Sequence, residues 1–242
     1  MSDMPQEHRP HEHRFETRAA LNIALAAEIA AWLGEAVGAR GAASFVASGG
    51  TTPGPLYDLL SETAVHWREV DVTLADERWV AADDPRSNER LIRERLLRDL
   101  GAAARFTPLK TAHAEPEDAE ATVSAALAAL PRPFDVMLLG LGENGHTASL
   151  FPHGQGLAAA LDQAAPELAR AIRPVPPDDP APPRLSMTLR ALLDSRRIVL
   201  FFTGAAKWAA YQDALGDGDI ADAPVRAVLR QAKVPVQVWW AP

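Results

Sequence analysis

Short apolar runs alternate along this chain with longer segments in which apolar residues recur every three or four positions. The first pattern predicts buried strands, and the second predicts helices that pack one face against a core. The predicted strands cover residues 43–47, 72–74, 136–139, 184–188, 198–202 and 234–240. The predicted helices cover residues 19–37, 87–100, 117–130 and 155–170, with shorter ones from residue 53, over 189–195 and around Lys207. This alternation predicts a single α/β domain over residues 1–242, with a doubly wound, mostly parallel sheet between two layers of helices, as in Rossmann-like folds.

Polar residues and proline mark the starts of two predicted helices. Thr52 is a favourable N-cap and Pro53 a favourable first helical residue, so a helix is predicted to begin there. Ser87 is predicted to cap the next helix, whose inner face is expected to include Leu100.

The start of the chain is polar. Residues 1–12 are interpreted as a flexible tail. His8, His11 and His13 are potential metal ligands, but a solvated tail accounts for them better. No metal site is predicted.

Composition narrows the class of protein. The 242 residues are 48% hydrophobic, and 24 Lys and Arg against 32 Asp and Glu give a formal charge of −8. Such an acidic chain is disfavoured as a general binder of nucleic acid or anionic membrane. The absence of cysteine excludes disulfides and thiolate metal sites. The sequence has neither a signal-peptide core nor a run of about 18 or more apolar residues. We therefore expect a cytoplasmic protein without a membrane, nucleic-acid or obligate protein partner.

A glycine-rich turn follows the predicted strand at 136–139. It contains Gly140, Gly142 and Gly145, and it ends at His146. Glycines let a backbone turn sharply and approach a ligand closely, and ligands of open α/β sheets bind beyond the carboxyl ends of strands. An imidazole at that place is suited to proton transfer near neutral pH. His146 is therefore the leading candidate for acid–base catalysis.

The same turn has the spacing G-x-G-x-x-G, which is typical of dinucleotide-binding proteins. That motif requires a long helix after its third glycine and an acid about 20 residues later. Here Pro152 ends any helix early, and Asp162 lies in an alanine-rich segment predicted to be helical. NAD binding is therefore disfavoured.

A second glycine turn follows the predicted strand at 43–47. It consists of Ser48, Gly49, Gly50, Thr51 and Thr52. Free backbone N–H groups and the positive end of the following helix dipole would favour an anion. The turn lacks the Gly-Lys-Ser/Thr of a Walker A loop, and an ordinary strand-to-helix turn is the alternative interpretation.

Charged residues follow two other predicted strands. Asp76, Glu77 and Arg78 come after the strand at 72–74, and Lys207 lies in the first turn of a predicted helix. A lysine there opposes the helix dipole, so an anion contact explains it better than helix stability does. A surface lysine whose stem packs on apolar residues, and simple solvation of residues 76–78, are the alternative interpretations. Because parallel strands end at one edge, these residues, the two glycine turns and Arg184 are expected to converge.

These residues resemble the sequence pattern of 6-phosphogluconolactonases, within the superfamily that includes glucosamine-6-phosphate deaminase. The similarity runs over about residues 15–240 in the family's order. Its most specific segment is Gly-His-Thr-Ala-Ser-Leu-Phe-Pro at 145–152, since the deaminase continues differently after its Gly-His pair. The other matching segments are residues 48–53, 76–78, 87–88, 142–144, 183–186 and 204–207.

The resemblance implies hydrolysis of 6-phospho-glucono-1,5-lactone to 6-phosphogluconate in the oxidative pentose phosphate pathway, without a metal or organic cofactor. It implies that His146 is the general base that activates water for attack on the lactone carbonyl. Asp76 and Arg78 would line the sugar side, and Arg78 is the candidate donor to the developing oxyanion. The implied phosphate ligands are Ser48, Gly49, Gly50, Thr51, Thr52, Arg184 and Lys207.

Position 144 departs from the family pattern, because many members carry an acid immediately before the Gly-His pair. Asn144 can orient a loop or bind a substrate hydroxyl, so it is assigned to substrate binding, but it cannot take a proton. His146 is then expected to be oriented by Glu143, Asp76 or a backbone carbonyl.

Two other functions are considered. An amino-sugar phosphate deaminase or isomerase needs carboxylates for ring opening and proton transfer on carbon, and Asn144 counts against it. A sugar-phosphate-sensing module of a transcriptional regulator is expected to follow a helix-turn-helix segment, for which the first ~15 residues are too short. That function also gives no reason for His146.

Overall fold

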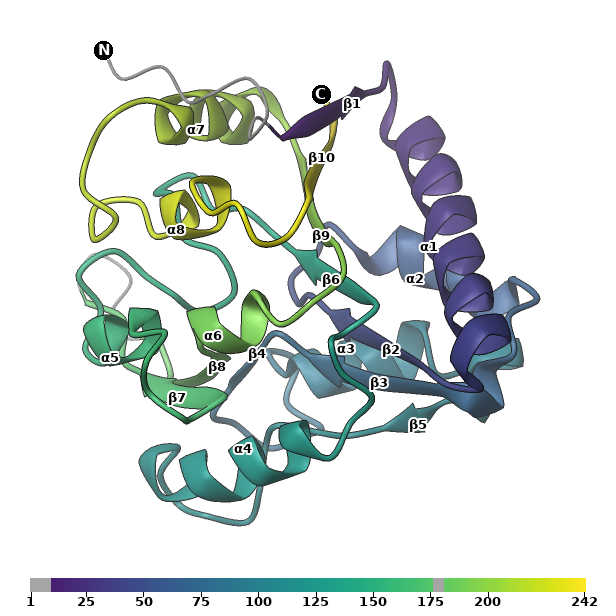
Figure 1. The fold of residues 1–242 in the computed structure, drawn as a ribbon, viewed down its shortest axis with the longest axis horizontal. Coiled ribbons are helices and arrows are strands. Elements are labelled where there is room, and N and C mark those ends of the chain that lie inside the picture. Colours follow the sequence, from purple (N-terminus) through teal and green to yellow (C-terminus); the bar gives the residue numbers. More distant parts are fainter. Residues whose placement is uncertain (1–9, 176–180) are drawn as a thin grey trace.

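Seven parallel strands form the central sheet of the computed structural model, which describes residues 10–175 and 181–242 (Figure 1). In order across the sheet, they are β1 (His11–Arg14), β10 (Val236–Ala241), β9 (Ile198–Thr203), β6 (Val136–Leu139), β2 (Ala43–Ala47), β3 (Val70–Leu74) and β5 (Arg105–Phe106). Every residue of β2 and β6 is buried, because helices cover both faces of the sheet, and their sequences are correspondingly apolar. The predicted mostly parallel α/β fold is confirmed.

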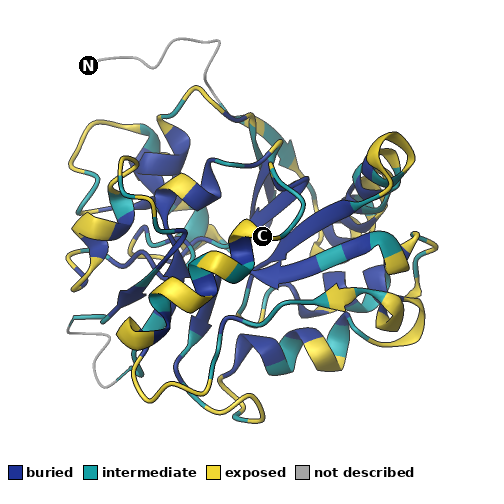
Figure 2. Ribbon diagram, turned by 60° about the horizontal axis from the view of Figure 1, so that its bottom comes forward, coloured by how far each residue is buried: buried dark blue, intermediate teal, exposed yellow. Residues whose placement is uncertain are grey.

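Helices flank the sheet on both sides. In Figure 1, α1 and α2 lie to the right of the sheet, and α7 and α8 lie to the left. Figure 2 shows helices that are buried toward the strands and exposed on their outer faces. The α-helices are α1 (Arg18–Arg40), α2 (Gly54–Glu62), α3 (Asn88–Arg95), α4 (Glu120–Ala128), α5 (Leu157–Leu161), α6 (Leu189–Leu192), α7 (Ala205–Leu215) and α8 (Val225–Leu229), and 3₁₀ turns cover Trp67–Glu69, Asp99–Ala103 and Glu117–Ala119.

Helix α1 shows how local sequence and core packing agree. It begins after Thr17, whose side chain accepts a hydrogen bond from the backbone N–H of Ala20, and it ends at Gly41 with φ 73°. Its apolar stripe, which includes Leu25 and Ile29, is buried as predicted. The helix has 23 residues, and an 18-residue stretch of it has a mean hydropathy of 1.4. This is enough by length and composition to cross a membrane, but the buried stripe is typical of a core helix.

A second, antiparallel sheet stands beside the first and was not predicted. It consists of β4 (Asp76–Arg78), β8 (Arg184–Met187) and β7 (Ala169–Ile172) in that order. Asp76 pairs with Ser186, and Arg78 pairs with Arg184. This sheet brings the charged residues that follow β3 next to Arg184.

The prediction of a helix over residues 155–170 is wrong for most of that segment. Helix α5 covers Leu157–Leu161, and the segment ends in strand β7. Ser124 in α4 accepts a hydrogen bond from the N–H of Leu168 at 3.1 Å, and Glu120 accepts one from the backbone of β7 at 2.8 Å. These contacts and the pairing with β8 hold the backbone extended and outweigh the helix propensity of alanine.

Two predicted helix boundaries also change. Helix α2 has Pro53 as its N-cap, so the prediction of Thr52 as the cap is wrong. Ser87 caps α3 as predicted, with its hydroxyl accepting a backbone N–H of the first turn at 3.2 Å. That helix ends at Arg95, however, and Leu100 is 51% exposed in the following 3₁₀ turn rather than on an inner face.

The first described residues complete an edge of the sheet. Residues 1–9, which include His8, lie outside the described residues. Within the predicted tail, His11 and Glu12 instead belong to β1, which pairs in parallel with β10. The ring nitrogens of His11 and His13 form a hydrogen bond of 2.8 Å. The polar start of the chain is thus ordered from β1 onward.

Candidate active site

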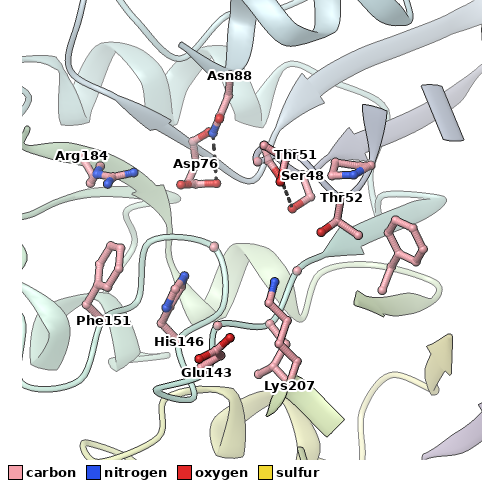
Figure 3. A pocket seen from close by; sticks show the side chains of 18 of the residues that line it. Ser48, Thr51, Thr52, Asp76, Asn88, Glu143, His146, Phe151, Arg184 and Lys207 are labelled. Atoms are coloured by element: carbon pink, nitrogen blue, oxygen red, sulfur yellow. Dashed lines mark hydrogen bonds between the residues drawn. The ribbon is translucent and has the colours of Figure 1, made fainter. Parts of the chain in front are cut away.

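The carboxyl ends of β2, β3, β6 and β9 point to one edge of the sheet, where a cavity of about 610 Å³ opens. Figure 3 shows side chains from the loops that follow these strands directed into the cavity. All residues that the sequence assigned to a site line it, namely Ser48, Gly49, Gly50, Thr51, Thr52, Asp76, Arg78, Asn144, His146, Arg184 and Lys207. The predicted convergence of the turns is confirmed.

The turn after β2 is held against two neighbouring elements. The hydroxyl of Tyr57 in α2 donates to the carbonyl of Ser48 at 2.6 Å, and Tyr57 is fully buried. Gly50 has φ 87°, a conformation that favours glycine. Gly49 lies so close to Asn88 that an added Cβ would be 2.0 Å from the amide oxygen of Asn88. The turn is therefore fixed with the N-terminus of α2 behind it, a geometry suited to an anion.

Backbone hydrogen bonds close the loop that carries His146. The N–H of Gly142 donates to the carbonyl of His146 at 2.9 Å, and the N–H of Gly145 donates to the carbonyl of Gly142 at 3.0 Å. The hydroxyl of Thr147 donates to the carbonyl of Gly140 at 2.8 Å. This turn follows directly from the buried strand β6, so a rigid element positions the histidine.

Within the described residues, three neighbours limit the orientation of the imidazole of His146. The side-chain oxygen of Asn144 lies 2.6 Å from Nδ1 of His146 and accepts the backbone N–H of His146 at 3.2 Å. The ring of Phe151 lies 4.5 Å away, centroid to centroid. A Cβ on Gly142 would be 2.1 Å from the imidazole, so glycine is required there. The expectation that Glu143, Asp76 or a carbonyl orients the ring missed the contact with Asn144.

Asp76 anchors the histidine-bearing loop to β4. Asp76 is 6% exposed, and its carboxylate accepts a hydrogen bond from the hydroxyl of Ser149 at 2.5 Å. The amide nitrogen of Asn88 donates to the carbonyl of Asp76 at 2.8 Å. Sequence reasoning gave Asn88 no role, although the Ser87-Asn88 pair belongs to the family pattern. Its amide oxygen is buried without a hydrogen-bond partner among the described residues, beside the cavity.

Glu77 and Arg78 have different surroundings although they are adjacent. Glu77 is fully buried and accepts the N–H groups of Asn88 and Glu89 at 2.8 and 2.7 Å, so it holds the N-terminus of α3. Burial raises the pKa of Glu77, although these backbone donors act in the opposite direction. Arg78 lines the cavity and donates to the carbonyl of Arg86, and its Nε is buried without a partner in the described part of the chain.

Two cationic side chains besides Arg78 reach the cavity from different elements. Lys207 lies in the first turn of α7, as predicted, and Figure 3 shows it between Glu143 and the turn after β2. Burial lowers the pKa of Lys207, and the nearby charge of Glu143 partly opposes this effect. Arg184 begins β8, and its guanidinium lies 5.4 Å from the ring centre of Phe151. Arg184 thus approaches from the side of the cavity that carries His146.

A histidine and three cationic side chains in one cavity at the carboxyl ends of parallel strands define an α/β enzyme for a small anionic substrate. The family model described as glucosamine-6-phosphate isomerases/6-phosphogluconolactonase matches residues 16–240. The chain belongs to this family.

Similar proteins match almost the whole chain. A 6-phosphogluconolactonase of Caulobacter vibrioides is 45% identical over 234 residues, covering 94% of this chain and 95% of the relative. One from Rhizobium meliloti is 43% identical over 230 residues, covering 95% of this chain and 98% of the relative. A crystal structure of a 6-phosphogluconolactonase from Shewanella baltica superposes with a TM-score of 0.92 at 43% identity, covering 96% of this chain and 98% of that one.

Proposed function

We propose that this chain hydrolyses 6-phospho-D-glucono-1,5-lactone to 6-phosphogluconate in the oxidative pentose phosphate pathway, and that His146 is the general base. The observation that carries the proposal is that His146 shares one cavity with Lys207 and the turn after β2. Relatives that match over almost their whole length and are named 6-phosphogluconolactonase support the choice of substrate.

The reaction needs one water molecule and one proton-accepting group. His146 takes a proton from water as the water oxygen attacks C1 of the lactone. Negative charge then develops on the carbonyl oxygen of C1, and Arg78, whose Nε is buried without a partner in the described part of the chain, is the proposed donor to it. The bond between C1 and the ring oxygen breaks, and that oxygen receives the proton from His146.

The remaining residues hold the substrate in place. Lys207 and the turn after β2 bind the phosphate, with Arg184 as the second cation. Asp76 lines the sugar side, where its fixed carboxylate accepts hydroxyl groups. Asn144 is the proposed partner of a substrate hydroxyl, and its side-chain oxygen also contacts Nδ1 of His146. Cytoplasmic location and the absence of nucleic-acid, membrane and obligate protein partners stay predictions from the sequence.

The direct test supplies freshly made 6-phosphogluconolactone to the purified protein and follows acid release, with spontaneous hydrolysis subtracted. We expect enzymatic acid release from the lactone and no ammonia release from glucosamine 6-phosphate. The reverse pattern would show an amino-sugar deaminase instead.

The assignment of the phosphate site has its own test. Each charged contact contributes roughly 1.5–3 kcal/mol, so Lys207→Ala and Arg184→Ala should each lower kcat/KM by about 10–150-fold. Glucono-1,5-lactone, which lacks the phosphate, is the matched control substrate. If the replaced residue binds the phosphate, its alanine variant should keep most of its activity on this control. Equal losses of activity on both lactones would show that the residue does not bind the phosphate.

A further inference from the structure

We infer that Asn144 is a positioning residue that fixes His146 as the Nδ1–H tautomer and leaves Nε2 as the proton acceptor. The inference rests on the proposed role of His146 as general base. It goes beyond the assignment of Asn144 to substrate binding, and it concerns the position at which this chain replaces the family's acid.

The geometry decides which end of the Asn144 amide faces the histidine. An amide group can present either its oxygen, which accepts, or its NH₂, which donates. The backbone N–H of His146 points to the same Asn144 atom at 3.2 Å, and a backbone N–H can only donate. That atom is therefore the oxygen.

The tautomer follows from this orientation. The Asn144 oxygen lies 2.6 Å from Nδ1 of His146, so Nδ1 must carry the proton for a hydrogen bond to form. In the neutral imidazole, the lone pair available for proton transfer is then on Nε2. Figure 3 shows the imidazole directed from its loop into the cavity, on the side of Asp76. Nε2 is thus the ring nitrogen that carries the lone pair in the neutral side chain.

A neutral partner changes the second half of the reaction. A carboxylate at this position would stabilise the imidazolium that forms when His146 accepts a proton from water. The Asn144 amide offers a hydrogen bond without a negative charge, so the imidazolium is a stronger acid. It therefore returns its proton more readily to the ring oxygen as the bond to C1 breaks.

Other charges in the cavity act on the same imidazole. Among the residues that the structure describes, they are Asp76 and Arg78 on β4, Glu143 beside Asn144, Arg184 on β8 and Lys207 on α7. All of them are unchanged in Asn144→Asp, so a comparison of the two proteins isolates the effect of one carboxylate. Because Asn144 is solvent-exposed, the added charge is partly screened.

Nitrogen NMR of the free protein tests the tautomer without catalysis. In protein labelled with ¹⁵N-histidine, His146 should show a protonated Nδ1 and an unprotonated Nε2 at neutral pH. Asn144→Asp should keep this pattern, whereas Asn144→Ala should add the Nε2–H form. The signals of His66 and His113, which lie outside the cavity, serve as internal controls in a folded variant. A native His146 protonated at Nε2 would overturn the inference.

Kinetics separates positioning from substrate binding. Asn144→Ala should lower kcat by about 10–100-fold with KM within about threefold, because the ring loses its orientation. Asn144→Asp should stay within roughly tenfold of the native kcat. Its acid-side fall in activity should move to higher pH by about 0.5–1 unit, because a stabilised imidazolium persists to higher pH.

The kinetic outcomes that contradict the inference are equally specific. A higher KM with unchanged kcat and tautomer in Asn144→Ala would make Asn144 a substrate contact. If the acid-side fall in activity of Asn144→Asp occurs at the same pH as in the native protein, residue 144 does not contact His146. If His146→Ala stays active while native His146 is the Nδ1–H tautomer, the positioning holds and the proposed base fails, so the two ideas are tested separately.

Discussion

Replacing Gly142 with alanine should disable the site without disturbing the fold. The new Cβ would lie 2.1 Å from Nδ1 and Cε1 of His146, against about 3.4 Å for ordinary van der Waals contact. The imidazole or its loop must therefore shift by about 1 Å, and Phe151 at 4.5 Å limits where the ring can go. A displacement of about 1 Å in a catalytic group costs on the order of 10²-fold in rate, which corresponds to about 2.7 kcal/mol.

The assay compares kcat for lactone hydrolysis in Gly142→Ala and Gly34→Ala. Gly34 is the matched control, because it lies in α1 and a Cβ there meets nothing within 4 Å. The control should keep full activity and equal or slightly higher stability, since alanine is favoured in a helix. If folded Gly142→Ala keeps more than a third of the native kcat, the reasoning that the ring must stay in its observed place is refuted.

Three further predictions concern stability and pH. Glu77→Gln should lower stability by about 2–4 kcal/mol, because the amide replaces an acceptor of buried N–H groups with a donor; a melting temperature within about 2 °C of native would contradict this. The pKa of Glu77 is higher in the folded protein than in the unfolded chain, so its contribution to the free energy of unfolding should decline as pH rises from about 4.5 through the raised pKa. Denaturant titrations of the native protein and of Glu77→Gln should therefore differ in how the free energy of unfolding changes with pH. Because burial lowers the pKa of Lys207 below its ordinary value of 10.5, affinity for 6-phosphogluconate should fall with rising pH before pH 10.5 is reached, in a range where the phosphate is already dianionic. Calorimetry showing constant affinity up to pH 10.5 would remove Lys207 from the phosphate site.

The central strands of the main sheet were predictable because they are buried on both faces, whereas the edge strands β1 and β5 are partly exposed and were not predicted. Runs such as residues 136–139 and 198–202 need no tertiary information, and parallel pairing sends their following turns to one edge. Because the turns that follow parallel strands lie at one edge of the sheet, His146 and Lys207 were expected to lie in one cavity. The helical stripe of α1 was equally clear, since it faces the same core.

The second sheet was not predictable, because long-range contacts determine it. Strand β7 is alanine-rich and becomes extended through hydrogen bonds to Ser124 and Glu120, which lie more than 40 residues away. The burial of Glu77 likewise depends on where α3 begins in space, so the sequence could not separate it from its charged neighbours.

The sequence predicted which residues belong to the candidate site better than it predicted the contacts between them. A short motif showed that His146 and Asn144 lie in one turn, but the side-chain hydrogen bond between them depends on the closure of that turn. One signal for Asn88 was present in the sequence: it directly follows Ser87, the helix cap, a short distance after the charged residues 76–78. Its link to Asp76 and its proximity to Gly49 appear only when α3 is packed beside both.

The most direct test of the account is the rate of 6-phosphogluconolactone hydrolysis by His146→Ala, measured against the native protein after subtraction of spontaneous hydrolysis. The account predicts a fall in kcat of about 10²–10⁴-fold, or roughly 2.7–5.4 kcal/mol, with the melting temperature and 6-phosphogluconate binding preserved. A folded His146→Ala protein that keeps more than a third of the native kcat would contradict the claim that His146 activates the water.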